Sequence, residues 1–446
     1  TLVLNGANIT NKTLTLNGPG AGPGWGSLDV ESGTNSWAGP VILNADSTID
    51  VYIGLSQLHI NGPISGAGGF EQFGALASAG TLFLEGPAAN TYAGQTTVDV
   101  LSTLSLSKAA SVHSIPGNNL SVAGTVQLLS DDQVADGTEV NIQNTGQVLL
   151  NTHACYMDGL SGSGKLDLGT AFAAVGWAGG TSAFNGIISG PGTLFTGGFI
   201  TLNGNNTYTG PTYIDYNELV INGSQPQSQV VVNPTCTLAG TGTVNIVQAN
   251  GILSPGNLTG ILNSSNVTFS ATGTFKVELN GTNTGAGYSQ LNVTGTVALA
   301  SASLQVLAGT VGATNNHYTI INNDVADAVS GTFAGLAEGA TLVANDGAHY
   351  TISYHGGSGN DVVLTQTSLA SQPAITGIQK LPGGGMQLGG IGISNLTYTV
   401  QANTNLITAT WVTIGTASAP VNTNVFQFTD PQATNYLQRF YRFSWP

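Results

Sequence analysis

Acidic side chains gather at one place in the sequence, the stretch SDDQVADGTEV, which contains Asp131, Asp132, Asp136 and Glu139. Two carboxylates about 5 to 10 Å apart can hydrolyse a glycosidic bond, and a base beside a cation can cleave a uronate polymer by elimination. The stretch lies between strand-like patterns in a turn-rich setting, and no Lys or Arg stands near it in the sequence. The residue pattern therefore favours a solvated loop over a catalytic site.

Histidine and cysteine offer little more chemistry. None of the six His stands in a spacing typical of zinc ligands or of a nucleophile and its base, and His153 with Cys155 is the one suggestive pair. The two cysteines, Cys155 and Cys236, either form a disulfide or remain two buried thiols, and both alternatives are open at this point. We therefore expect no catalytic residues and a protein that is not an enzyme.

A single calcium-binding pattern occurs near the end of the first region. GGSGND, at residues 356–361, matches one copy of the GGxGxD nonapeptide, which makes Asn360 and Asp361 candidate calcium ligands. Such sites are built from stacked tandem copies, and the following VVLTQ does not continue the pattern. A terminal turn is favoured, so we expect no cofactor, with calcium as the alternative.

Composition limits the class of protein. Only 7% of the 446 residues are charged, against about 25% in a typical globular domain, and 63 are Gly. The net charge of −15, without a basic cluster, argues against nucleic acid as a partner. No apolar run approaches the roughly 20 residues that span a bilayer. We expect an extracellular or cell-surface protein, exported by a signal upstream of Thr1.

Short strands with period-two alternation recur along the chain, each ending in Asn, Gly or Ser, and no helical period competes with them. Such spacing predicts an all-β parallel solenoid, in which each coil needs a neighbour to bury its apolar face. The expected internal ladders are formed by Leu2/Leu4, Leu14/Leu16, Val140/Ile142, Ile200/Leu202, Val244/Ile246 and Leu291/Val293.

Two stretches, at residues 66–100 and 190–214, share a longer pattern in which a Gly-rich turn and an alternating strand lead to Asn-Thr-Tyr-x-Gly and then to a Thr-led strand. The second, GPGTLFTGGFITLNGNNTYTGPTYI, with the later LVINGS, TLAGTGTVN, ANGILSPGN and YHGGSGNDVVLTQ, resembles the autotransporter-associated β-strand repeat over roughly residues 65–365. The resemblance implies a right-handed parallel β-helix at residues 1–365 that is exported and displayed outside the cell.

The composition shifts after Val363. Residues 366–376 are expected to form a linker, and residues 377–446 resemble the small Ig/fibronectin-III-like β-sandwich found at the ends of secreted bacterial proteins. Trp411 and the pair Phe440/Tyr441 are its expected core anchors.

The pattern at the two ends points to assembly. The chain begins in alternating strand, and an open solenoid end is a template for pairing. The leading hypothesis is a non-enzymatic structural subunit whose copies join head to tail into a surface fibre, sheath or layer. Its interface candidates are Leu2, Leu4, Phe440, Tyr441, Phe443 and Trp445.

Two other functions remain as alternatives. The protein could be a cell-surface adhesin or glycan-binding stalk whose C-terminal module binds cell-surface glycans. A polysaccharide lyase or hydrolase is disfavoured by the sparse acids, bases and His.

Overall fold

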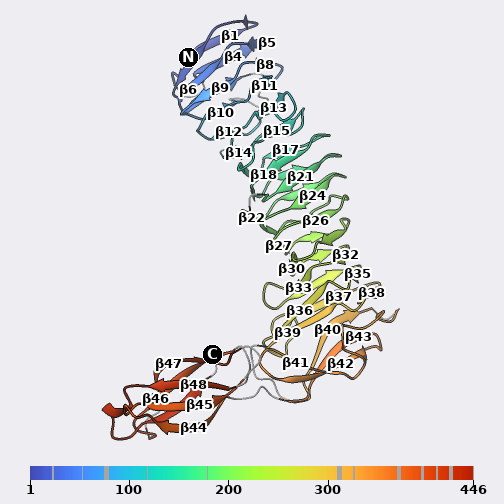
Figure 1. Cartoon of the computed structure of the whole chain (residues 1–446). Coiled ribbons are helices and arrows are strands. Elements are labelled where there is room, and N and C mark those ends of the chain that lie inside the picture. The colour runs from blue at the N-terminus through green and yellow to red at the C-terminus, as the bar shows by residue number, and fades with distance from the viewer. Residues whose placement is uncertain are drawn as a thin grey trace.

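The structure is a computed structural model of the chain, and its described residues are 1–22, 25–52, 54–74, 80–117, 119–177, 179–308, 314–324, 327–368, 373–392, 396–407, 410–420 and 425–444. Within these ranges the secondary structure is β except for one short 3₁₀ helix, η1 (Ala433–Asn435). The predicted all-β class is confirmed. Figure 1 shows the coils stacked in chain order, followed by a separate C-terminal module.

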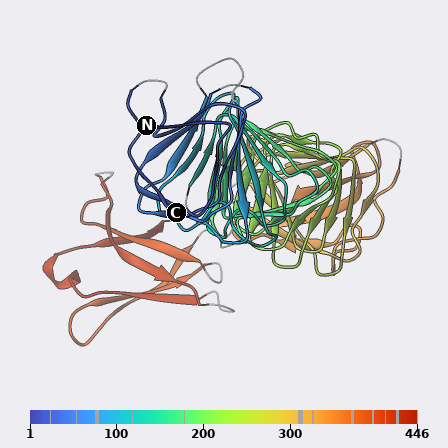
Figure 2. The ribbon, with the colours of Figure 1, turned by 90° about the horizontal axis from the view of Figure 1, so that it is seen from above.

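Successive coils place their strands on three faces in turn, and equivalent strands of neighbouring coils pair in parallel. The chain is therefore a parallel β-solenoid, as predicted, and Figure 2 shows the stacked coils after a 90° turn. The first face is a 15-stranded sheet that runs the length of the solenoid. Its strands are β1 (Leu2–Asn5), β4 (Leu28–Ser32), β7 (Ser47–Val51), β10 (Phe70–Phe73), β12 (Thr96–Val98), β14 (Leu120–Val122), β16 (Glu139–Ile142), β19 (Gly159–Gly162), β22 (Thr181–Phe184), β25 (Phe199–Leu202), β27 (Glu218–Ile221), β30 (Thr237–Gly240), β33 (Ile252–Pro255), β36 (Thr274–Leu279) and β39 (Ser303–Ala308).

The second face changes sheets along the solenoid. A nine-stranded sheet ends at β23, an isolated bridge joins Asn205 to Ser224, and a new sheet starts at β28. The nine strands are β2 (Asn8–Ile9), β5 (Thr34–Trp37), β8 (Gln57–Ile60), β11 (Thr81–Gly86), β13 (Thr103–Lys108), β15 (Thr125–Leu128), β17 (Gln147–Leu149), β20 (Lys165–Asp167) and β23 (Ile187–Ser189). The parallel part of the new sheet comprises β28 (Ser224–Gln225), β31 (Thr243–Val244), β34 (Ile261–Ser264), β37 (Gln290–Val293) and β40 (His317–Asn323).

The third face is also built in two stretches. Three strands begin it, namely β3 (Leu14–Asn17), β6 (Val41–Ala45) and β9 (Ile64–Gly66). An eight-stranded sheet later takes this side, formed by β18 (Cys155–Met157), β21 (Phe172–Val175), β24 (Thr193–Thr196), β26 (Thr212–Ile214), β29 (Val230–Val232), β32 (Ile246–Ala249), β35 (Asn266–Phe269) and β38 (Val297–Ala298).

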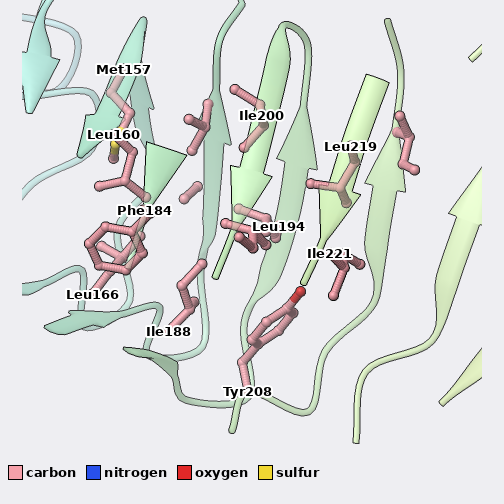
Figure 3. Packing of buried hydrophobic residues seen from close by; sticks show 14 of the residues in the cluster. Met157, Leu160, Leu166, Phe184, Ile188, Leu194, Ile200, Tyr208, Leu219 and Ile221 are labelled. Atoms are coloured by element: carbon pink, nitrogen blue, oxygen red, sulfur yellow. The ribbon is translucent and has the colours of Figure 1, made fainter. Parts of the chain in front are cut away.

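Alternation along each strand builds one continuous core. In β25, Ile200 and Leu202 point inward and are buried while Phe199 is exposed, which is the period of two that a pleated strand imposes. A single cluster of buried side chains extends from Leu4 to Leu364. Figure 3 shows part of it, with residues from successive coils stacked in ladders.

Most of the predicted ladder pairs lie in this core, with two exceptions. Leu2 is 38% exposed, although Leu4 of the same strand is buried. Ile246 is exposed while Val244 is buried, because β31 ends at Val244 and β32 begins at Ile246 on the next face. The alternation was read across a corner of the coil.

The repeated Asn-Thr-Tyr stretch is a buried corner that ties coils together. Asn90 Oδ1 accepts a hydrogen bond of 2.8 Å from the Ile64 backbone N–H of the preceding coil, and the Tyr92 hydroxyl hydrogen-bonds Thr96 Oγ1. The second copy repeats both contacts at Asn206, which accepts from the Ile188 N–H at 2.9 Å, and between Tyr208 and Thr212. The repeat therefore encodes a structural corner.

The C-terminal end of the solenoid is covered by antiparallel structure. β40 pairs in parallel with β37 on one side and antiparallel with β43 (Asp361–Gln366) on the other, and β42 (His349–Gly356) and β41 (Thr341–Val343) extend this sheet. Phe333 stacks on Phe275 with ring centroids 6.0 Å apart. The parallel ladder of the second face thus ends at β40.

The C-terminal module consists of two three-stranded antiparallel sheets, as expected for a small sandwich. One contains β44 (Ala374–Lys380), β45 (Met386–Ile391) and β48 (Val425–Asp430), and the other β47 (Val412–Ser418), β46 (Thr397–Asn403) and β49 (Phe440–Ser444). Its core includes Tyr398, which stacks on Phe426 with centroids 5.0 Å apart. In the described part of the chain, no helix is long and apolar enough to cross a membrane.

Candidate interaction surfaces

A row of four aromatic rings lies on the outer side of the third face. Tyr156, Phe195 and Tyr213 occupy one register column on β18, β24 and β26, with Ala174 of β21 between the first two. Phe172 leans over this small residue and meets Tyr156 and Phe195 edge to face at centroid distances of 5.5 and 5.6 Å. Phe195 stacks on Tyr213 at 5.2 Å, so the row is continuous over four coils.

A second group of aromatics lies at the corner where the third face meets the first. Trp177 and Tyr216 meet edge to face at 5.7 Å, yet remain 49% and 58% exposed. They belong to coils two apart, and the coil between them has Gly197 and Gly198 at this corner. A Cβ on Gly198 would lie 2.2 Å from the Gly180 carbonyl oxygen, so close packing requires glycine there.

We call these six side chains, together with Phe199, which is 50% exposed on β25 of the first face, the aromatic surface; it consists of Tyr156, Phe172, Trp177, Phe195, Phe199, Tyr213 and Tyr216. The carboxylates of Asp158, Asp215 and Glu218 lie in the same corner segments. Sequence reasoning missed this surface because it weighed aromatics only in the C-terminal module. The sequence pattern that could have revealed it is an aromatic residue at the outward-facing position of the same strand in several coils.

Carboxyl groups gather on the outer side of the first face near its N-terminal end. Asp29 and Asp50 are direct neighbours on β4 and β7, and both are buried. One oxygen of Asp29 and both oxygens of Asp50 lack a hydrogen-bond partner in the described structure. Burial raises the pKa of Asp50 to about 7, and the Asp29 carboxylate adds to this rise.

A cavity of about 390 Å³ opens near these carboxyls, lined by residues that include Trp25, Thr48, Glu71 and Phe73. Thr48 donates a hydrogen bond to Glu71 over 3.4 Å. Burial raises the pKa of Asp29, and the charge of the exposed Glu31 adds to this rise. We call Asp29, Glu31, Asp50 and Glu71 the acidic head. It was not singled out by sequence because the four residues come together only when three coils stack.

A cavity of about 490 Å³ in the C-terminal module has a basic lining. Lys380 and Arg439 line it together with Tyr436 and Tyr441. Arg439 forms a buried ion pair of 2.7 Å with Asp430 and lies 4.2 Å above the Tyr436 ring. Tyr441 donates to the same carboxylate over 3.0 Å, and burial raises the pKa of Tyr441 to about 12.

Those of the predicted interface residues that the structure describes lie on the first strand of the solenoid and on the last strand of the C-terminal module. Leu2 and Leu4 belong to β1, which pairs only with β4 in the described chain. Tyr441 and Phe443 pack against the core of the C-terminal module, and Phe440 is half-buried on the same edge strand. Trp445 lies outside the described residues. The C-terminal aromatics are thus mainly core residues, and β49 is an edge strand that pairs with β46 in the described chain.

Asn360 and Asp361 act as structural links in the described chain. Asp361 Oδ1 accepts a 3.0 Å hydrogen bond from the Asn323 N–H, and the Asn360 amide donates to the carbonyls of Asp324 and Asp327. These contacts tie the turn before β43 to the end of β40. Among the described residues no group of three or more His, Cys, Asp and Glu is arranged to hold a metal ion. Calcium remains an untested prediction.

The two cysteines are unpaired and buried, which is the second of the two alternatives. Cys155 lies on β18 and Cys236 follows β29, four strands further along the same sheet, or about 19 Å at 4.8 Å per strand. A disulfide needs Cα atoms within about 7 Å. Burial also raises the pKa of the Cys155 thiol to about 12, so it stays protonated.

The acidic stretch of residues 131–139 contacts histidines of neighbouring segments. His153 Nδ1 lies 3.1 Å from Asp131 Oδ1, and His113 Nε2 lies 3.7 Å from Asp132 Oδ1. Both pairs are partly exposed, as expected for a solvated loop. His153 thus pairs with Asp131, an acid of the preceding coil. Cys155, which stands close to His153 in the sequence, is buried.

Comparison with known proteins adds no relative. A scan against protein-family models and a search of curated proteins both found no match to this chain. The resemblance to the autotransporter-associated repeat therefore stays a prediction from its motifs. The solenoid itself rests on the observed pairing of the coils.

Proposed function

We propose that this protein is a non-enzymatic structural rod of the extracellular surface whose copies associate end to end. In this proposal the acidic head of one copy contacts the basic C-terminal module of the next. Such a contact is heterologous, so its repetition produces a fibre or, with side contacts, a layer. The observation that carries the proposal is the separation of charge along the chain.

The charge difference between the two regions is large for so weakly charged a chain. Residues 374–446 hold Lys380, Arg439 and Arg442 against Asp430 alone, a formal net charge of +2. The whole chain carries −15, so residues 1–373 carry −17. Complementary potentials of this kind orient two copies and exclude the head-to-head arrangement, in which like charges meet.

The acidic head supplies the groups that a cationic partner would neutralise. These groups are the exposed carboxylates of Glu31 and Glu71, since Asp29 and Asp50 are buried beneath the surface. On the other side, Lys380 is exposed, and Arg442 lies 4.5 Å above the Trp411 ring. The continuous core from Leu4 to Leu364 would make each subunit a stiff spacer between contacts.

Sedimentation velocity of the purified chain tests the proposal. We expect oligomers at about 0.01 M ionic strength, where charges act over about 30 Å, and single rods at about 1 M, where they act over about 3 Å. Lys380→Glu with Arg442→Glu should abolish association, and so should Glu31→Lys with Glu71→Lys. Mixing the two variants should restore association into alternating chains. The unchanged acidic head of one variant then meets the unchanged basic module of the other, and the two reversed ends also carry opposite charges.

Lys276→Glu is the control for charge reversal as such, since it reverses one positive charge on the solenoid, half of the change made by the double variant, where Lys276 lies 3.7 Å from Glu278. Association that ignores salt, or that is lost equally in this control, would refute a charge-directed contact.

A second candidate function is a surface stalk whose C-terminal module binds a glycan. The cavity beside Tyr436 and Arg439 favours it, because an aromatic ring next to hydrogen-bond donors is suited to a sugar. Glycan-array binding by the full chain that is lost on Tyr436→Ala would support this function. Binding that survives Tyr436→Ala would exclude the module as the binding site.

A further inference from the structure

We propose that the aromatic surface on the solenoid binds a neutral polysaccharide chain that lies along the rod. This site is separate from the acidic head and from the C-terminal module, and it does not depend on end-to-end association. Its expected ligand is a polymer of pyranose units with equatorial hydroxyls, such as a β-1,4-glucan, whose ring faces are apolar.

The position of the rings supports an extended ligand. The four rings of the row follow the solenoid axis, with neighbouring centroids 5.2 to 5.6 Å apart. Four coils at about 4.8 Å per strand give a row about 14 Å long, which is several sugar units. The parallel sheet beneath fixes this spacing before any ligand arrives, so little conformational entropy is lost on binding.

Trp177 and Tyr216 add an exposed edge to the row. Their rings extend over Gly197 and Gly198, whose lack of side chains lets two coils about 9.6 Å apart bring their aromatics to 5.7 Å. Both rings nevertheless stay about half exposed. Contact of this apolar surface with water is unfavourable, and packing within the chain does not remove it. Phe199, on the intervening coil, is also half exposed.

The polar groups in the same corner segments select the charge of the ligand. Carboxylates accept hydrogen bonds from sugar hydroxyls, and Asp158, Asp215 and Glu218 provide three of them. Asp215 already accepts a 2.6 Å bond from Asn233, which holds it in place. An acidic corner repels uronate polymers, so the surface fits a neutral polysaccharide in preference to an anionic one.

Affinity electrophoresis and calorimetry of the full chain test this proposal, with hydroxyethyl cellulose and cello-oligosaccharides as neutral probes and polygalacturonate as the anionic probe. We expect the neutral probes to bind and to perturb Trp fluorescence. Trp177→Ala and Tyr216→Ala should each weaken binding about tenfold, as expected for a central aromatic contact.

Trp25→Ala is the matched control, because Trp25 is 49% exposed like Trp177 but lies beside the acidic head. It should leave polysaccharide binding unchanged, while Trp177→Ala should leave the salt-dependent sedimentation unchanged. The proposal is overturned if the neutral probes do not bind, if polygalacturonate binds better, or if Trp25→Ala matches Trp177→Ala. It is also overturned if Trp177→Ala changes sedimentation instead of binding, since the surface would then join copies of this chain.

Discussion

Asp50 is the residue whose environment departs furthest from that of an ordinary surface carboxyl. It points outward from a strand, yet it is fully buried beside Asp29, and neither of its oxygens has a hydrogen-bond partner among the described residues. Burial of this kind favours the protonated form, which is why the pKa of Asp50 rises from 3.8 to about 7. The acidic head is therefore sensitive to pH near neutrality.

This shift predicts the direction of a pH effect on stability. Between pH 3.8 and about 7 the folded chain keeps a proton on Asp50 that the unfolded chain has released. The free energy of unfolding should therefore fall as pH rises through this window, by about 1–3 kcal/mol. Asp50→Asn should remove most of this slope and should be the more stable protein at about pH 8.

Urea denaturation of both proteins at several pH values, followed by Trp fluorescence, measures the effect. Asp46→Asn controls for loss of an acid as such, because it changes a carboxyl group whose Oδ1 accepts a hydrogen bond from the Gly69 N–H. Parallel pH profiles for Asp50→Asn and the unchanged chain would contradict the prediction.

At the scale of elements, the repeated Asn-Thr-Tyr corner explains why the sequence repeats itself. Asn90 bonds the Ile64 N–H and also donates to the Ser114 carbonyl over 2.7 Å, so it links three coils. The Asn206 side chain accepts a hydrogen bond from the Ile188 N–H, and its amide nitrogen has no partner in the described structure. The two corners therefore have the same backbone arrangement, but the Asn90 side chain satisfies two buried backbone groups and the Asn206 side chain satisfies one.

This difference predicts unequal costs for the same substitution. Asn90→Ala would leave a buried N–H and a buried carbonyl unpaired, at about 1–3 kcal/mol each. Asn206→Ala would leave one buried group unpaired, the Ile188 N–H, and would also remove an amide nitrogen that has no partner in the described structure. It should therefore lower the free energy of unfolding by about half as much as Asn90→Ala. The exposed Asn203, which bonds Asn185, is the control, and Asn203→Ala should change stability by less than about 0.5 kcal/mol. Equal urea midpoints for Asn90→Ala and Asn206→Ala would count against this account.

Alternation in the sequence was enough to predict the strands and the parallel solenoid, because period two and Gly-rich corners are local properties. The antiparallel module was predicted from its resemblance to a small β-sandwich. It was not enough to locate corners, as Ile246 illustrates, since a strand pattern can continue across a turn. It also could not place the acidic head or the aromatic surface. Asp29 meets Asp50, and Phe195 meets Tyr213, only through the register of successive coils.

At the scale of the whole molecule, the two regions differ in charge as well as in fold. The solenoid is an acidic rod with one continuous core, and the module is a small, slightly basic sandwich. The counts of charged residues were in the sequence from the start. The counts become informative once the excess of acidic residues is placed in the solenoid and the small excess of basic ones in the C-terminal module that follows it in Figure 1.

The central claim, end-to-end association directed by charge, is tested most directly by negative-stain electron microscopy of the purified chain at low and high salt. At about 0.01 M ionic strength we predict strings of rods with an axial repeat of one subunit, which disperse into single rods at about 1 M. Single rods at every salt concentration, or side-by-side bundles without an axial repeat, would contradict the account.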